Sequence, residues 1–184
     1  DAPGKDYYRI SVKKETGMET PDGKVSNYLH NTVEEGEVLQ ISAPAGDFFL
    51  DTEKDTPVVL LSGGVGLTPM VSMLNTVADL QPEKEVTFIH AAQNGKVHAL
   101  KDEVAATAAK AKVNSVVFYD QPTEEDRENN NFDVEGYITK EWLKENVDLA
   151  QSDFYFCGPV PFMKAINTAL KGLGVTEDRI HFEF

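Results

Sequence analysis

Cysteine is nearly absent from this sequence, since Cys157 is the only one among 184 residues. A single thiol cannot form an intramolecular disulfide, hold an iron–sulfur cluster or build a cysteine-based zinc site. Basic residues are also scarce, with 17 lysines and arginines against 31 acidic residues and a net charge of −14. Such a surface repels phosphate backbones, so we expect no nucleic-acid partner, although backbone dipoles can still bind a compact nucleotide.

Long apolar runs are missing too. No stretch approaches the roughly 20 residues that span a bilayer, and no signal peptide is visible, so we expect no membrane partner. The unpaired thiol fits a reducing cytoplasm. The first residue is Asp1 rather than Met, which predicts a processed chain or an excised piece.

Short apolar runs recur instead from Val58 onward. They occupy residues 58–61, 86–89, 116–119 and 154–157, with starts 28, 30 and 38 residues apart. This spacing is close to the ~30 residues of a βαβ unit. Runs without alternation of polar and apolar residues are typical of a parallel sheet covered on both faces. The pattern predicts an α/β domain with a parallel Rossmann-like sheet and helices on both faces.

Two helical stripes fit between these runs, with apolar residues three or four positions apart. They are Met70, Leu74, Val77 and Ala78, and Met163, Ile166, Leu170 and Leu173. An Ala- and Lys-rich surface helix is expected at residues 97–112, a solvated loop at 123–131 and a last strand at 179–184.

The first fifty residues have a different character. The segments 7–15, "YYRISVKKE", and 38–50, "VLQISAPAGDFFL", are strand-like and separated by turns such as "TPDGK". We place a boundary in the polar stretch 51–56 and expect domains at 1–52 and 53–184. The leading piece is too short to close a β-barrel.

The stretch "SGGVGLTP" brings three glycines, Gly63, Gly64 and Gly66, to the point where a strand becomes a helix. Glycine permits positive φ and lets a ligand contact the backbone. Thr68 is expected to cap the helix and Pro69 suits its first turn, so the first N–H groups can bind a pyrophosphate. The stretch lacks the lysine of a P-loop, which disfavours ATP hydrolysis. The alternative is a tight turn without a ligand.

A second strand end, "FYFCGPVPFM", carries Cys157 followed by Gly158 and Pro159. Ligands of open α/β sheets lie outside the carboxyl ends of the strands, so both glycine-marked ends should face one crevice. A thiol is small and polarizable and can lie against a flat nicotinamide ring. The alternative is a small core residue, and no visible base partner makes Cys157 a nucleophile.

Two further positions are weaker candidates. Ser26 and the N–H groups after it could bind a phosphate at the start of a short helix, or form an ordinary cap. Glu183 lies in an apolar terminal strand and could equally be an outward-facing carboxylate. The histidines His30, His90 and His98 have no metal-like spacing, so we expect no metal site.

Seven segments together resemble the reductase portion of bacterial flavohemoglobins, in order along essentially the whole chain. They are "YYRISVKKE", "GKVSNYLHN", "APAGDFFL", "SGGVGLTPM", "FIHAAQNGKVHA", "FYFCGPVPFM" and "IHFEF". Flavohemoglobins are nitric oxide dioxygenases of the ferredoxin-reductase-like superfamily, with a haem globin, an FAD-binding β-barrel and an NAD(P)H-binding α/β lobe. The resemblance implies an oxidoreductase for nitric oxide detoxification. In it, hydride passes from the nicotinamide to the flavin and electrons pass to the haem, where oxygen and nitric oxide become nitrate.

The resemblance also assigns roles to individual positions. The family's NAD(P)H pyrophosphate loop corresponds to Gly63, Gly64, Val65, Gly66, Leu67 and Thr68. The motif beside the nicotinamide corresponds to Cys157, Gly158 and Pro159. Ser26 matches an FAD phosphate contact, and Glu183 matches an acid near the flavin that influences the flavin and haem redox potentials.

Parts of the family pattern are missing from the sequence. The flavin-holding Arg-x-Tyr-Ser is expected just before Asp1, and the flavin-stacking aromatic just after Phe184. A globin with its proximal haem histidine is absent as well. We therefore expect a piece with a partial FAD-binding lobe at 1–52 and an NAD(P)H-binding lobe at 53–184, whose partners are the globin and flavin lobes of the full-length chain. We expect this piece to bind dinucleotide weakly, to retain little FAD and to show no turnover.

No arginine follows the expected second strand at "HAAQNG", which favours NADH over NADPH, although Lys96 could meet a 2′-phosphate. Two alternatives remain open. One is the NAD(P)H–flavin reductase component of an oxygenase or a cytochrome reductase, which an iron–sulfur domain in place of the globin would favour. The other is a non-catalytic nucleotide-binding module, which a full-length protein without FAD or haem would favour.

Overall fold

The computed structural model describes residues 4, 6–17, 21–43 and 45–183. Three predicted features include residues outside these ranges: Thr20 of the expected turn, Pro44 of the second expected strand and Phe184 of the last one. The chain divides into two compact units, one formed by Asp1–Tyr8 with Phe48–Phe184 and the other by Arg9–Asp47. The division into domains 1–52 and 53–184 stays a prediction.

The larger unit is built on six parallel strands in the order β4-β3-β2-β1-β5-β6. The strands are β1 (Val58–Gly63), β2 (Val86–Ala92), β3 (Val113–Tyr119), β4 (Val134–Glu135), β5 (Asp153–Cys157) and β6 (Ile180–Phe182). The four apolar runs of the sequence lie in β1, β2, β3 and β5, so the predicted parallel sheet is confirmed. Strand β1 is buried along its whole length because it lies between two strands and under helices on both faces.

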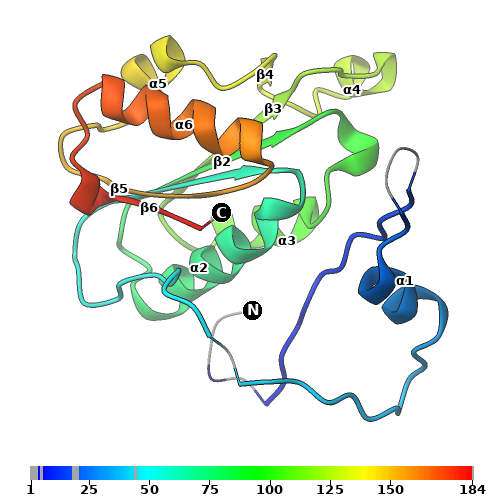
Figure 1. Ribbon diagram of the computed structural model, residues 1–184. Coiled ribbons are helices and arrows are strands. Elements are labelled where there is room, and N and C mark those ends of the chain that lie inside the picture. The colour runs from blue at the N-terminus through cyan, green and yellow to red at the C-terminus, as the bar shows by residue number, and fades with distance from the viewer. Residues whose placement is uncertain (1–3, 5, 18–20, 44, 184) are drawn as a thin grey trace. The chain divides into compact units, whose positions relative to one another are not determined.

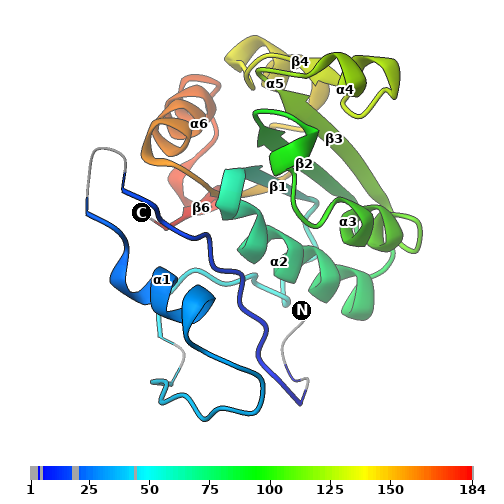
Figure 2. The same ribbon diagram turned by 90° about the vertical axis from the view of Figure 1, so that its right-hand side faces the viewer.

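Helices cover both faces of this sheet (Figure 1 and Figure 2). Helices α2 (Leu67–Leu80) and α3 (Lys101–Ala108) lie on one face, and α5 (Lys140–Asn146) and α6 (Val160–Gly172) lie on the other. Of the eight predicted stripe residues, Ala78 and Leu173 are half-buried and the other six are buried: Met70, Leu74, Val77, Met163, Ile166 and Leu170. None of the helices in the described part of the chain has the length and apolar character needed to cross a membrane.

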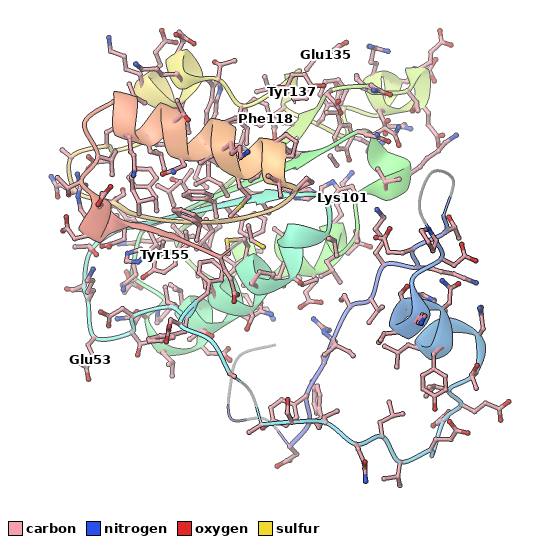
Figure 3. All side chains as sticks on the ribbon, in the orientation of Figure 1. Glu53, Lys101, Phe118, Glu135, Tyr137 and Tyr155 are labelled. Atoms are coloured by element: carbon pink, nitrogen blue, oxygen red, sulfur yellow. The ribbon has the colours of Figure 1, made fainter. Side chains whose placement is uncertain are left out.

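The sheet separates two hydrophobic cores, each marked by one labelled aromatic side chain in Figure 3. Phe118 of β3 packs on the α5 side, with its ring edge-on to Trp142 at a centroid distance of 4.9 Å. Tyr155 of β5 packs on the α2 side, where its ring centroid lies 6.4 Å from that of Phe48. Each large side chain buried in these cores stabilises the fold by roughly 1.5–3 kcal/mol.

Two predicted segments differ from the observed ones. Residues 97–112 are helical only in their middle, because Leu100 has a left-handed φ of 56° and forms the N-cap of α3. The solvated loop predicted at 123–131 is wrong, since it contains α4 (Glu124–Glu128). Thr123 and Asp126 form a capping box there, which satisfies first-turn N–H groups and stabilises the short helix.

The smaller unit contains α1 (Lys24–Asn31), which is tied to Glu15 through the Gly23 N–H at 3.1 Å. The segments predicted as strands, 7–15 and 38–50, contain no strand among their described residues. A strand is stable only when a hydrogen-bonded neighbour and a covered face accompany it, and here Val38 is 93% exposed. The expected strands of a flavin-binding barrel are therefore not formed in the described part of this unit.

Ionic side chains hold the segment before β1 to the amino ends of the strands. The carboxylate of Asp153, which begins β5, accepts hydrogen bonds from Lys54 Nζ at 2.9 Å and Thr56 Oγ1 at 2.5 Å. His181 Nε2 lies 3.0 Å from the same carboxylate. Burial by itself raises the pKa of Asp153, but the hydrogen bonds from Thr56, His181 and Lys54 outweigh it and lower that pKa. Lys84 Nζ donates to the Lys54 carbonyl at 2.5 Å.

Candidate functional site

The strand order reverses between β1 and β5. Strands β2, β3 and β4 follow β1 outward on one side, whereas β5 and β6 lie on its other side. In open α/β sheets, ligands bind outside the carboxyl ends of the strands at such a switch point. The register pairs Ser62 with Cys157, so the two predicted glycine-marked strand ends lie side by side, as expected.

The first loop exposes bare backbone at one position in particular. Strand β1 ends at Gly63, and the 3-10 turn η1 (Gly64–Gly66) leads into α2. Gly64 has φ +52°, and a Cβ added to it would meet no atom within 4 Å. Gly64 and Val65 are exposed, while Gly66 and Leu67 are buried. A ligand can therefore reach the backbone at Gly64, and a residue with a side chain would be strained there.

Gly66 serves a different purpose, although it belongs to the same motif. Its φ is −61°, which any residue can adopt. A Cβ at this position would collide with the Cys157 carbonyl. At Gly158, an added Cβ would come within 2.7 Å of the Phe162 ring and 3.1 Å of Gly63 N. The two loops thus pack backbone against backbone, which holds the two strand ends at a close separation.

The predicted capping role of Thr68 is wrong. Helix α2 begins at Leu67 with Gly66 as its N-cap, so Thr68 is already inside the first turn. Its hydroxyl donates to the Val65 carbonyl at 3.4 Å and does not act as the cap acceptor. Pro69 lies in the first turn, as predicted. Gly66 has no side chain to cap the helix, and the Leu67 N–H donates to the Gly64 and Val65 carbonyls. An anion at this end would therefore meet the positive end of the helix dipole and the open backbone at Gly64.

Cys157 ends β5 and is half-buried. Burial raises the pKa of its thiol, the nearby Glu183 carboxylate raises it further, and a backbone hydrogen bond from Gly158 opposes them. The thiol is therefore neutral at pH 7. Pro159 follows as the N-cap of α6.

Glu183 follows β6 and lies beside Cys157, which ends the neighbouring strand β5. Strand β6 pairs with β5 through Phe182 and Phe156, and Glu183 is the next residue beyond this pair. Its side chain is exposed, and its charge acts on the Cys157 thiol. The predicted acid therefore joins the two glycine loops at the carboxyl edge, while its influence on redox potentials stays a prediction.

Ser26 belongs to the smaller unit. It is the third residue of α1 and not its N-cap, which is Gly23. Its hydroxyl donates to the Gly23 carbonyl at 3.3 Å and accepts the Glu15 N–H at 3.2 Å. With its single proton engaged in this way, Ser26 ties α1 to the preceding chain. The predicted contact of Ser26 with an FAD phosphate stays a prediction.

A buried polar cluster near the end of β2 was not predicted. Ser62 Oγ lies 2.8 Å from His90 Nδ1, the His90 ring contacts the His98 ring at 4.5 Å, and His98 Nδ1 lies 2.9 Å from Tyr119 Oη. Asp126 is 3% exposed and accepts the Gly95 N–H at 3.2 Å. The sequence signal was only a histidine within an apolar strand, which usually indicates packing.

Other site classes find no support in the described residues. Among residues 4, 6–17, 21–43 and 45–183, no group of three or more histidine, cysteine or acidic side chains could hold a metal ion. A shallow hollow lies at the amino edge of the sheet, lined in part by Asp55, Gln81 and Lys84. It is on the edge opposite to the glycine loops and does not coincide with the predicted site.

Comparison with known proteins agrees with this geometry. Residues 60–168, more than half of the chain, match the oxidoreductase NAD-binding domain family. The whole chain is 56% identical to a flavohemoprotein of Bacillus cereus and corresponds to 46% of that protein. The chain therefore spans about half the length of the curated relatives it matches.

Solved structures give the same result. The flavohem-like FAD/NAD-binding domain of nitric oxide dioxygenase from Vibrio cholerae superposes with a TM-score of 0.82 at 38% identity, covering 94% of this chain and 68% of that one. A flavohemoglobin from Malassezia yamatoensis with bound FAD and haem has a TM-score of 0.74 at 25% identity, covering 95% of this chain and 42% of that one. The chain belongs to the oxidoreductase NAD-binding domain family and, within it, to the reductase part of the flavohemoproteins.

Proposed function

We propose that the larger unit binds a nicotinamide dinucleotide at the switch point between β1 and β5. The observation that carries this proposal is the pair of glycine loops packed against each other there, with Gly64 open to solvent. The open backbone at Gly64 and the positive end of the α2 dipole bind the pyrophosphate. The bound dinucleotide supplies a hydride, and the chain orients it between the two strand ends.

We also propose that the full-length protein acts as a nitric oxide dioxygenase. Its FAD and globin haem would carry electrons from NAD(P)H to the conversion of nitric oxide and oxygen into nitrate. High identity to flavohemoproteins along the whole chain supports this over a reductase component of an oxygenase. A cytoplasmic location, NADH as the preferred donor, and roles for Ser26 and Glu183 beside the flavin belong to the same proposal.

The binding site is tested by calorimetric titration of the chain with NADH. We expect binding that the Gly64→Ala substitution weakens about tenfold, or about 1.4 kcal/mol, because the added methyl group points into open space where the dinucleotide would lie. Gly174→Ala is the matched control, since Gly174 also has positive φ (+85°) with nothing within 4 Å, but follows α6. Equal loss of affinity in both variants, or no binding at all, would contradict the proposed site.

The expected lack of flavin and turnover in the isolated chain is tested by a separate measurement. The isolated chain should carry no stoichiometric flavin and should not reduce electron acceptors with NADH. A purified chain that is yellow with bound flavin and turns over without haem would overturn this expectation, since it would mean that the chain forms a complete flavin site.

A further inference from the structure

The loop formed by residues 93–98 follows β2 at the carboxyl edge of the sheet. In open α/β sheets that bind dinucleotides, the ribose of the adenosine half is recognised near the end of the second strand, where a 2′-hydroxyl and a 2′-phosphate are told apart. The groups that hold this loop in place therefore bear on cofactor choice.

The carboxylate of Asp126 holds the backbone of the 93–98 loop in place. Its carboxylate accepts hydrogen bonds from Gly95 N at 3.2 Å, from Thr123 N at 2.9 Å and Oγ1 at 2.8 Å, and from Asn131 Nδ2 at 3.2 Å. A Cβ on Gly95 would collide with this carboxylate, so the loop backbone lies directly against it. The Asp126 side chain of α4 thereby fixes the loop at Gly95, which lies 31 residues earlier in the sequence.

The amides of the loop are already engaged within the protein. Gly95 N–H donates to Asp126, Lys96 N–H to the Asn94 side chain at 3.2 Å, and Val97 N–H to the Asn94 carbonyl at 3.2 Å. At the start of α2 no side chain caps the helix, and the Leu67 N–H donates to the Gly64 and Val65 carbonyls instead. Three consecutive amides that could otherwise bind a phosphate are thus occupied in the 93–98 loop.

The polar layer beneath the loop carries a negative charge. The Thr123 backbone hydrogen bond is the main reason that the pKa of Asp126 falls to about 2, so it is ionised. Burial lowers the pKa of His90 to about 3, with His98 adding to the effect, and burial lowers that of His98 to about 4. Both imidazoles are neutral at pH 7 and do not offset the carboxylate.

The two lysines near the loop are exposed, so solvent screens their effect on a bound phosphate. Lys96 of the loop is exposed, and Lys101 at the start of α3 (Figure 3) is also exposed and donates to Asn131 Oδ1 at 2.9 Å. Charges in water are screened within about 10 Å at ordinary ionic strength, whereas a buried charge is screened much less. The Asp126 carboxylate is instead buried and contacts the loop backbone directly, through Gly95 N at 3.2 Å.

We propose that Asp126 is a positioning residue that sets selectivity at the 93–98 loop, favouring a dinucleotide with a free ribose 2′-hydroxyl over one with a 2′-phosphate. Asp126 acts in two ways: it takes up the Gly95 N–H that could bind a phosphate, and its charge repels that phosphate. The inference rests on the proposed dinucleotide site at the switch point.

The test compares two ligands that differ only at this position, ADP-ribose and its 2′-phosphate ester. We expect the unaltered chain to bind ADP-ribose at least tenfold more tightly in calorimetric titrations. Asp126→Asn removes the charge at nearly constant volume and should reduce this ratio at least threefold. Glu125→Gln is the matched control, because it removes the same charge from an exposed position on α4 and should leave the ratio unchanged.

The ratio of the two affinities distinguishes a change in ligand selectivity from a general loss of protein stability. A change of Asp126 that only loosened α4 would weaken both ligands alike, and an unchanged ratio in folded Asp126→Asn would overturn the proposal. If that variant does not fold, equal affinities of the unaltered chain for the two ligands overturn it instead. Failure of the unaltered chain to bind either ligand would mean that the switch-point site itself is wrong.

Discussion

The two edges of the parallel sheet are built from different chemical groups. At the carboxyl edge, Gly63, Gly66 and Gly158 bring main chain against main chain, and Gly64 leaves main chain open to solvent. At the amino edge, the Asp153 carboxylate gathers charged and polar side chains around the segment that precedes β1. The contrast indicates that close backbone packing forms the carboxyl edge, while hydrogen bonds and ion pairs between side chains stabilise the amino edge.

The largest expected effect is at the carboxyl edge. Gly66→Ala should lower the free energy of unfolding by about 3 kcal/mol, because the added methyl group meets the Cys157 carbonyl and overpacking of a rigid site costs that much. Chemical denaturation measures the loss.

Gly64→Ala is the control for Gly66→Ala. It should cost only about 1 kcal/mol, the strain of a left-handed residue, since its methyl group meets nothing within 4 Å. Equal destabilisation by the two substitutions would show that the loops are not packed as described.

The amino edge should respond to Asp153→Ala with a loss of about 2 kcal/mol in the free energy of unfolding. Removing one partner of a buried ion pair costs about 3–5 kcal/mol. Here, however, the side chains of Lys54 and His181 are 39% and 29% exposed and can be rehydrated. NADH affinity should stay unchanged, since the change is on the opposite edge. A tenfold weaker affinity in a folded variant would contradict the separation of the two edges.

The remaining effect depends on pH and is measured as a slope of stability against pH. His90, near the carboxyl edge, has its pKa lowered by burial from 6.5 to about 3. The unfolded chain therefore takes up this proton first, so stability is present above pH 6.5 and is lost as pH falls toward 3. The loss should be about 1.4 kcal/mol per pH unit.

Between about pH 6.5 and pH 4.5, His98, whose pKa burial lowers to about 4, adds a similar slope, while Asp126 and Asp153, whose pKa values are lowered, lose stability only at more acidic pH. His90→Asn keeps a polar group near Ser62 and should reduce the slope by about half, because the contribution of His98 remains. An unchanged slope in His90→Asn would show that this imidazole is protonated in the folded state.

Much of the fold could be predicted from local pattern. Apolar runs at regular spacing imply a parallel sheet whatever the surroundings, because only burial on both faces suits them. The helical stripes of α2 and α6 followed from spacing in the same way. The strand predicted at residues 7–15 is wrong, since none of its described residues is in a strand. Local pattern was not enough there, because a strand also needs a neighbouring strand to pair with.

The candidate site was predicted in outline, but the roles within it were not. The glycine motif indicated a backbone site, yet Gly64 and Gly66 are glycines for opposite reasons, open space at one and close packing at the other. Asp126 was placed in a solvated loop because nothing in its neighbourhood marks it as buried. Its contact with Gly95 exists only through the pairing of β2 with β3.

By itself, the amino-acid sequence determined strands β1, β2, β3 and β5, helices α2 and α6 and the two glycine-marked strand ends, because hydrophobic periodicity and backbone freedom are local properties. Tertiary structure alone decided which glycine faces a ligand and which faces Cys157, which carboxylates are buried, and how the amides of the 93–98 loop are used. Those features depend on distances between residues far apart in the chain, and packing sets these distances.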